Sequence, residues 1–175
     1  MVDLERTRDL FMVAAIFGVF GFAWAGWAQE GPPPRARALL GVLAGASLLV
    51  GAAGGYLAWR HWDDPSALAG AEDGIRFGII VGIETAVSLI GSVVLAVVGH
   101  GRRIAAWVSL VVGLHFIPLV FLFDNLTLLA PAVAMVTAAV LAWRSSRTLP
   151  SAVTGLVNAP VLLLTAAANL ALALA

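Results

Sequence analysis

The sequence predicts an all-α integral membrane protein: a bundle of six transmembrane helices in a single transmembrane domain, residues 1–175. The first observation is composition, since 61% of the residues are hydrophobic and only 11% are charged. A soluble domain is about 45–50% apolar and about 25% charged, and a domain of this size has too much surface to hide the excess from water. The second observation is that the apolar residues form six separate stretches, each near the roughly 20 residues that cross a bilayer.

The first three helices are predicted from apolar runs that end in polar or helix-breaking residues. The first covers about residues 10–28 and stops before Gly31 and three consecutive prolines, which cannot continue a helix. The second covers about residues 38–59. A polar loop is expected from Asp63 to Asp73, and the third helix follows it at about residues 77–98.

The last three helices are closely spaced in the sequence. They are predicted at about residues 104–123, 126–143 and 153–175. Asp124 and Asn125 supply a tight turn between the fourth and fifth helices. Because each flanking stretch is close to 20 residues long, two full crossings are favoured over one broken hairpin.

The first helix also has features of a secretory signal peptide. Arg6 and Arg8 precede its apolar run, and Ala23 and Ala25 have the small side chains that flank a cleavage site. The apolar run is nearly long enough to cross the membrane, however. We therefore expect it to remain as the first transmembrane helix.

Arginine distribution predicts how the chain is oriented in the cell membrane. Six crossings place both termini on one side, and four of the ten arginines accompany them. Because cytoplasmic loops carry an excess of basic residues, the loops with six arginines should be cytoplasmic and both termini extracytoplasmic. The six arginines are Arg35, Arg37, Arg102, Arg103, Arg144 and Arg147.

A short repeat relates the two halves of the chain. The residues Leu-Ala-Trp-Arg occur at 57–60 and again at 141–144. The same offset superposes the third predicted helix on the sixth, as in two inverted three-helix halves, an arrangement used by many transporters. Since four common residues make a short match, a bundle without internal repeats remains the alternative.

Small residues at every fourth position predict close helix packing. They occur as Ser47, Gly51 and Gly55 in the second predicted helix, and as a row of three glycines at 74, 78 and 82 in the third. Such rows let helix backbones approach closely within a membrane. The same faces permit a homo-oligomer in addition to contact with the bilayer.

Ionisable side chains within the predicted helices are the candidates for a functional site, because burying them in a membrane is costly. Glu84 lies in the third helix, with Ser88 one turn later on the same face. His115 is near the centre of the fourth helix, three residues before Pro118. A proton shared between the carboxyl group and the imidazole is the chemistry that these two side chains suggest.

The sixth helix carries a polar stripe at helical spacing. Asn158, Thr165 and Asn169 share one side of it. The positions of Glu84, His115 and Asn169 along their helices place them at similar depths in the membrane. They are therefore predicted to converge on one pocket in its outer half. Asp124 and Asn125 are expected near its mouth. The alternative is structural, since a Glu–His pair or buried amides can hold helices together without binding a ligand.

The sequence does not contain the residues or motifs that several classes of chemistry require. The chain has no cysteine and all ten basic residues are arginine, which excludes thiolate sites and Schiff-base lysines. Its three histidines fall in different places, so no metal site is expected. Motifs for nucleotide binding or serine hydrolysis are absent. With zero net charge, the sequence predicts no nucleic-acid partner, and no cofactor is expected.

Three functions agree with these features. The favoured interpretation is a permease or proton-coupled carrier of a small solute, with Glu84 and His115 in its pocket. The second is an intramembrane enzyme, of the cyclase or isomerase type, that acts on a lipophilic substrate. The third is an accessory membrane subunit without chemistry of its own. The sequence leaves open whether the protein is an enzyme. It predicts that a lipid-accessible cavity would favour the second interpretation and a water-filled vestibule the first.

Overall fold

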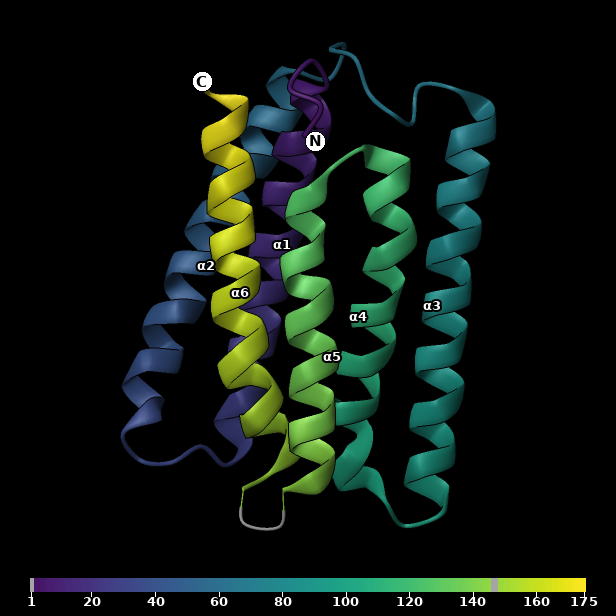
Figure 1. Cartoon of the computed structure of the whole chain (residues 1–175). Coiled ribbons are helices and arrows are strands. Elements are labelled where there is room, and N and C mark those ends of the chain that lie inside the picture. Colours follow the sequence, from purple (N-terminus) through teal and green to yellow (C-terminus); the bar gives the residue numbers. More distant parts are fainter. Residues whose placement is uncertain (1, 146–147) are drawn as a thin grey trace.

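The computed structural model describes residues 2–145 and 148–175, and this part of the chain is all-helical (Figure 1). Its six long helices are all long and apolar enough to cross a membrane. They are α1 (Thr7–Trp27), α2 (Ala36–Arg60), α3 (Ala71–Val97), α4 (Ile104–Phe123), α5 (Leu129–Arg144) and α6 (Pro150–Ala173). Three short 3₁₀ turns precede or follow them: η1 (Ala28–Glu30), η2 (Gly101–Arg103) and η3 (Leu126–Leu128). Arg147, used above for orientation, lies outside the described residues.

The six predicted helices are confirmed, and their limits differ mainly in α3. This helix begins at Ala71, six residues before the predicted start, so the loop expected up to Asp73 was wrong at its end. Glu72 and Asp73 occupy the first turn, where a negative charge interacts favourably with the helix N-terminus. Both carboxylates also bond to the Arg76 guanidinium. These polar residues extend the helix beyond the apolar run from which it was predicted.

The six helices alternate in direction along the chain. Figure 1 shows α1 and α3 running in the same direction, while α1 begins and α6 ends at the same end of the bundle. The loop between α2 and α3 lies at this end too. At the opposite end are the α1–α2, α3–α4 and α5–α6 connections.

The core lies around α1 and α6. Helix α1 packs on α2 and α6, and α6 also contacts α4 and α5. The largest buried side chains of this core include Phe17, Trp24, Phe116, Met135 and Leu162. Among the described helices α3 is different, because it packs extensively only on α4 and none of its residues is buried.

Small residues determine how closely α1 and α2 approach. A β-carbon added to Gly18 of α1 would collide with the backbone of Gly51 in α2, so glycine is needed at this crossing. The predicted packing row in α2 is therefore used within the chain. By contrast, added β-carbons on Gly74, Gly78 and Gly82 of α3 would meet no described atom within 4 Å. The α3 row does not hold this fold together.

A tryptophan of α4 makes close contact with α3, in addition to the packing of Phe123 on Phe77 nearer the start of α3. Trp107 of α4 donates a hydrogen bond from Nε1 to the backbone oxygen of Val87 in α3 (3.2 Å). Its indole also occupies the space beside Gly91, where a β-carbon would collide with the ring. A tryptophan thus packs directly against the backbone of α3.

Candidate functional site

A cleft of about 810 Å³ lies between α1 and α3, with α4 behind it. This volume is within the range of small-molecule sites. Aromatic and aliphatic side chains make up most of the lining. From α1 they include Met12, Ile16, Phe17, Phe20 and Trp24; from α3, Phe77, Val81 and Leu89; and from α4, Val112, Phe116 and Leu119. The cleft exists because α3 contacts α4 while leaving the facing side of α1 uncovered.

Glu84 and His115 both line this cleft. Glu84 is the central residue of the 27-residue α3, and His115 lies near the middle of α4. The His115 imidazole lies beside the backbone of Ile80, one turn before Glu84 in α3. The structure therefore brings the two predicted ionisable groups together. Since α3 begins earlier than predicted, Glu84 is central in its helix and not displaced towards its N-terminal end.

The Glu84 carboxylate is held by hydroxyl groups of its own helix. Ser88 donates a hydrogen bond from Oγ to Oε1 (3.2 Å), and Thr85 donates one to Oε2 (3.3 Å). Ser92 donates to the backbone oxygen of Ser88 (2.6 Å). All four residues line the cleft. They form a narrow polar stripe on one wall of an otherwise apolar site.

His115 has an unused polar atom. Its Nδ1 is buried and has no hydrogen-bond partner among the described residues. A buried nitrogen without a partner is destabilising by about 1–3 kcal/mol. The ring lies 5.3 Å from that of Phe116, which in turn packs on Phe17 at 5.0 Å. The imidazole is thus placed in aromatic surroundings, with hydrogen-bonding capacity that the protein leaves unused.

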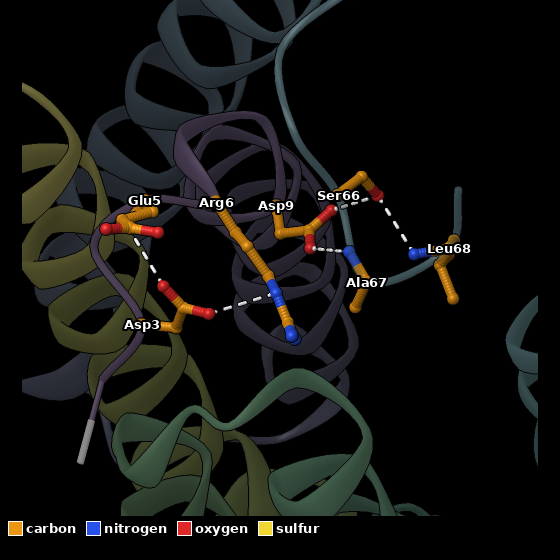
Figure 2. Close-up of polar contacts among 7 residues, drawn as sticks. All are labelled: Asp3, Glu5, Arg6, Asp9, Ser66, Ala67 and Leu68. Carbon is orange, nitrogen blue, oxygen red and sulfur yellow. Dashed lines mark hydrogen bonds and ion pairs between the residues drawn. The ribbon is translucent and has the colours of Figure 1, made fainter. Parts of the chain in front are cut away.

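The loop between α2 and α3 contributes Trp62, Ser66 and Leu68 to one end of the cleft lining, and Figure 2 shows how this loop is bonded to α1. Asp9 of α1 is only 7% exposed, and it accepts hydrogen bonds from Ser66 Oγ and Ala67 N, each at 2.6 Å. The neighbouring Arg8 donates to the backbone oxygen of Trp62 (2.6 Å) and lies over its indole ring. Sequence reasoning missed this cluster, because acids and arginines at a span end resemble an ordinary solvated flank.

The predicted polar stripe of α6 lies elsewhere. Asn169 accepts a hydrogen bond from Asn125 Nδ2 (2.7 Å) and donates to Thr127 Oγ1 and to the backbone oxygen of Thr165, both at 2.8 Å. Asp124, which ends α4 in the left-handed conformation (φ 47°), accepts a backbone hydrogen bond from Asp3. None of these residues is among those that line the cleft. The expected single pocket is therefore divided into two separate clusters.

Asn158 forms another buried connection. Its Nδ2 donates to Ser109 Oγ of α4 (2.9 Å), and Ser109 donates to the backbone oxygen of Met135 in α5 (2.8 Å). These two hydrogen bonds link α4, α5 and α6 at a place where Asn158 and Ser109 are 0% exposed. Asn158 Oδ1 has no partner among the described residues. The arrangement is that of a buried connection between helices, away from the cleft lining.

Metal-binding geometry is not found in the described part of the chain. Within residues 2–145 and 148–175, no group of three or more histidine or acidic side chains is close enough to hold a metal ion. The ionisable side chains that line the cleft are Glu84 and His115 near its middle and Arg8 and Asp9 at its end, with serine and threonine hydroxyl groups nearby. Comparisons with protein-family models, curated proteins and solved structures find no match to this chain.

Proposed function

We propose that the protein binds an elongated lipophilic molecule in the cleft between α1 and α3, where Glu84 and His115 exchange protons with it. One observation supports this proposal above the others. The cleft is lined mainly by apolar side chains, and the two ionisable groups face it from neighbouring helices near their midpoints. This function corresponds to the second of the sequence-based interpretations, an intramembrane enzyme of the isomerase or cyclase type.

The position of the cleft favours a ligand that arrives from the bilayer. It lies between the two helices that leave a gap in the bundle, and Ile16 and Phe20 on its α1 side are 40% and 54% exposed. If all six helices span the membrane, this side faces lipid. A hydrophobic molecule then reaches Glu84 laterally, without crossing a layer of water.

An acid and a base in one apolar cleft can move a carbon–carbon double bond. The Glu84 carboxylic acid donates its proton to one alkene carbon and becomes a carboxylate, leaving a carbocation on the substrate. Neutral His115 then removes a proton from the adjacent carbon, the electrons of that C–H bond form the new double bond, and His115 becomes imidazolium. Return of this proton to Glu84 restores both groups. Phe17 and Phe116 supply aromatic faces that stabilise a cation.

We also propose that the halves are related as inverted repeats, with α3 and α6 as counterparts. In such a repeat α1 also corresponds to α4, and α2 to α5. The contact between α3 and α4 then corresponds to the contact between α6 and α1, and both contacts occur. Helix α6 has further contacts with α2, α4 and α5, whereas among the described helices α3 has no comparable contacts with their counterparts. The cleft lies beside α3, and the Asn158–Ser109 connection lies in the corresponding place beside α6.

The proposed orientation places both termini and the α2–α3 loop outside the cytoplasm. Its support is the arginine excess at the other end of the bundle. Because the chain lacks cysteine, single cysteines can be labelled without a background. In intact cells, a membrane-impermeant maleimide should label a cysteine at Leu68, and one at Gly101 should react only after permeabilisation. The reverse pattern would overturn the orientation.

Binding is tested with a photoreactive long-chain alcohol and purified protein in phosphatidylcholine nanodiscs. We expect the probe to label α1, α3 and α4 at the cleft, and Thr85→Trp to block labelling by filling it. The control is Ile79→Trp, which changes an exposed α3 residue outside the cleft lining. Labelling confined to other surfaces, or unaffected by Thr85→Trp, would overturn the proposal.

A further inference from the structure

Arg8 is a basic side chain at the end of the cleft, and it uses only part of its hydrogen-bonding capacity. It donates one hydrogen bond, from Nη1 to the backbone oxygen of Trp62, and its guanidinium lies 5.0 Å from the centre of the Trp62 ring. Arginine has five N–H donors in one plane, so stacking on an aromatic ring leaves most of them available. Among the described residues no carboxylate forms an ion pair with it.

Several other charged groups at this end have partners of their own. Arg6 pairs with Asp3 at 3.0 Å, and Arg76 pairs with Glu72 and Asp73. Acidic side chains of α1 and of the α2–α3 loop also have neighbours of their own. Asp9 accepts two hydrogen bonds from the loop, Asp64 pairs with His61 at 2.9 Å, and Asp63 lies beside Arg60 in a separate surface hollow. Arg8 is thus the one arginine among the described residues that line the cleft.

We propose that Arg8 binds the anionic headgroup, a carboxylate or a phosphate, of a single-chain amphiphile whose hydrocarbon chain lies along the cleft. This inference rests on the proposed function and names the class of its ligand. Both headgroups match the planar donors of arginine. A headgroup at Arg8 would lie beside Trp62 at the end of the bundle, and the chain would extend between α1 and α3 past Ser88.

The helix spacing defines which part of such a chain meets the ionisable pair. Phe17 packs on Phe116, the neighbour of His115, and therefore marks the depth of the imidazole on α1. Phe17 follows Arg8 by nine residues, which at 1.5 Å per residue is about 13 Å along α1. The cleft continues beyond this depth to Trp24 and Trp27. Glu84 and His115 would thus act on an internal position of the chain and not on its headgroup or its end.

The experiment compares three photoreactive probes that differ only in the headgroup: a 16-carbon carboxylic acid, the corresponding alcohol and the corresponding alkyl phosphate. Each is incubated with protein in phosphatidylcholine nanodiscs, and labelling of the cleft is titrated. We expect one or both anionic probes to bind at least about tenfold more tightly than the alcohol, the ratio expected for a charged hydrogen-bonding pair. The tighter of the two identifies the headgroup.

Arg8→Gln should remove this preference and leave binding of the alcohol unchanged. Arg8→Lys should restore part of it, since it keeps the charge but not the planar donors. Arg60→Gln is the matched control, because it removes an exposed arginine at the same end that does not line the cleft. A thermal melt of each variant shows whether the fold is intact.

Two outcomes would overturn the headgroup assignment while the proposed function stands. In the first, the acid, phosphate and alcohol label the cleft equally. In the second, the preference for an anion survives Arg8→Gln or disappears equally in Arg60→Gln. If no probe labels the cleft, the proposed function itself fails. Moving the photoreactive group along the chain provides a further check: at about 13 Å from the headgroup it should label Phe17 or Phe116, and next to the headgroup it should label Met12.

Discussion

The side-chain oxygen of Asn169 lies 2.7 Å from the amide nitrogen of Asn125, and this hydrogen bond connects α6 to the turn between α4 and α5. Both side chains are almost completely buried. The amide nitrogen of Asn169 donates in addition to Thr127 and to the backbone of Thr165. A single amide side chain thus fastens one helix to the connection between two others.

Asn169→Ala should therefore destabilise the protein without changing the cleft. It removes the partner of Asn125 and Thr127, and we expect the free energy of unfolding to fall by about 1–2 kcal/mol. Thr137→Ala is the control, since Thr137 is exposed and donates only to the backbone of its own helix. Reversible unfolding in mixed micelles measures both variants. Equal stabilities for the two would show that the buried network contributes nothing.

Glu84→Gln should abolish proton exchange with a bound lipophilic substrate and leave the fold intact. Glutamine has nearly the same volume and can still accept the hydrogen bond from Ser88, but it cannot donate and recover a proton as a carboxyl group does. The measurement is deuterium transfer from D₂O to a bound alkene probe, with a thermal melt alongside. Glu72→Gln, an exposed change in the same helix, is the control. Deuterium transfer at the wild-type rate in Glu84→Gln would exclude Glu84 as the acid.

Gly18→Ala should separate α1 from α2. The new methyl group would collide with the backbone of Gly51, and overpacking of this kind typically lowers stability by about 1–3 kcal/mol. The matched change is Gly78→Ala, because an added β-carbon there would meet no described atom within 4 Å. Thermal melts of the two variants should differ clearly. A Gly18→Ala protein as stable as Gly78→Ala would mean that the helices separate at negligible cost.

Asp9→Asn should release the loop that covers the end of the cleft. Asparagine retains one acceptor oxygen, so it can hold either Ser66 or Ala67 but not both in the present geometry. We expect faster hydrogen–deuterium exchange at Ala67 and Leu68. Asp3→Asn is the control at the same end of the bundle, since Asp3 bonds to Glu5 and Arg6 and not to the loop (Figure 2). Equal exchange rates in the two variants would contradict a restraining role for Asp9.

Much of the fold was predictable because each helix carries its own signal. The apolar run of the fourth predicted helix gives both observed limits of α4, Ile104 and Phe123. The start of α3 was missed because its first turn is polar and gains stability from Arg76 and the helix N-terminus. Hydropathy does not contain this information.

The candidate site was predictable only in part. Glu84 and His115 were recognised individually by their cost in an apolar segment, and adjacent helices bring them together. Asn169 has the same kind of signal, but helical periodicity gives the face of a helix and not the helix opposite it. Asn169 consequently faces Asn125 instead of Glu84. The Asp9 cluster depends on a contact with Ser66, which is 57 residues away in the sequence, and no local pattern predicts that contact.

The dependence of α3 on a single neighbour has a mechanical consequence. Helix α3 touches α4 at both of its halves, from Phe77 beside Phe123 to Val87 beside Trp107, so this line of contact can act as a hinge. A small rotation of α3 about it would open or narrow the path beside α1. Ligand affinity would then depend on the stiffness of the α3–α4 seam as well as on the side chains that touch the ligand.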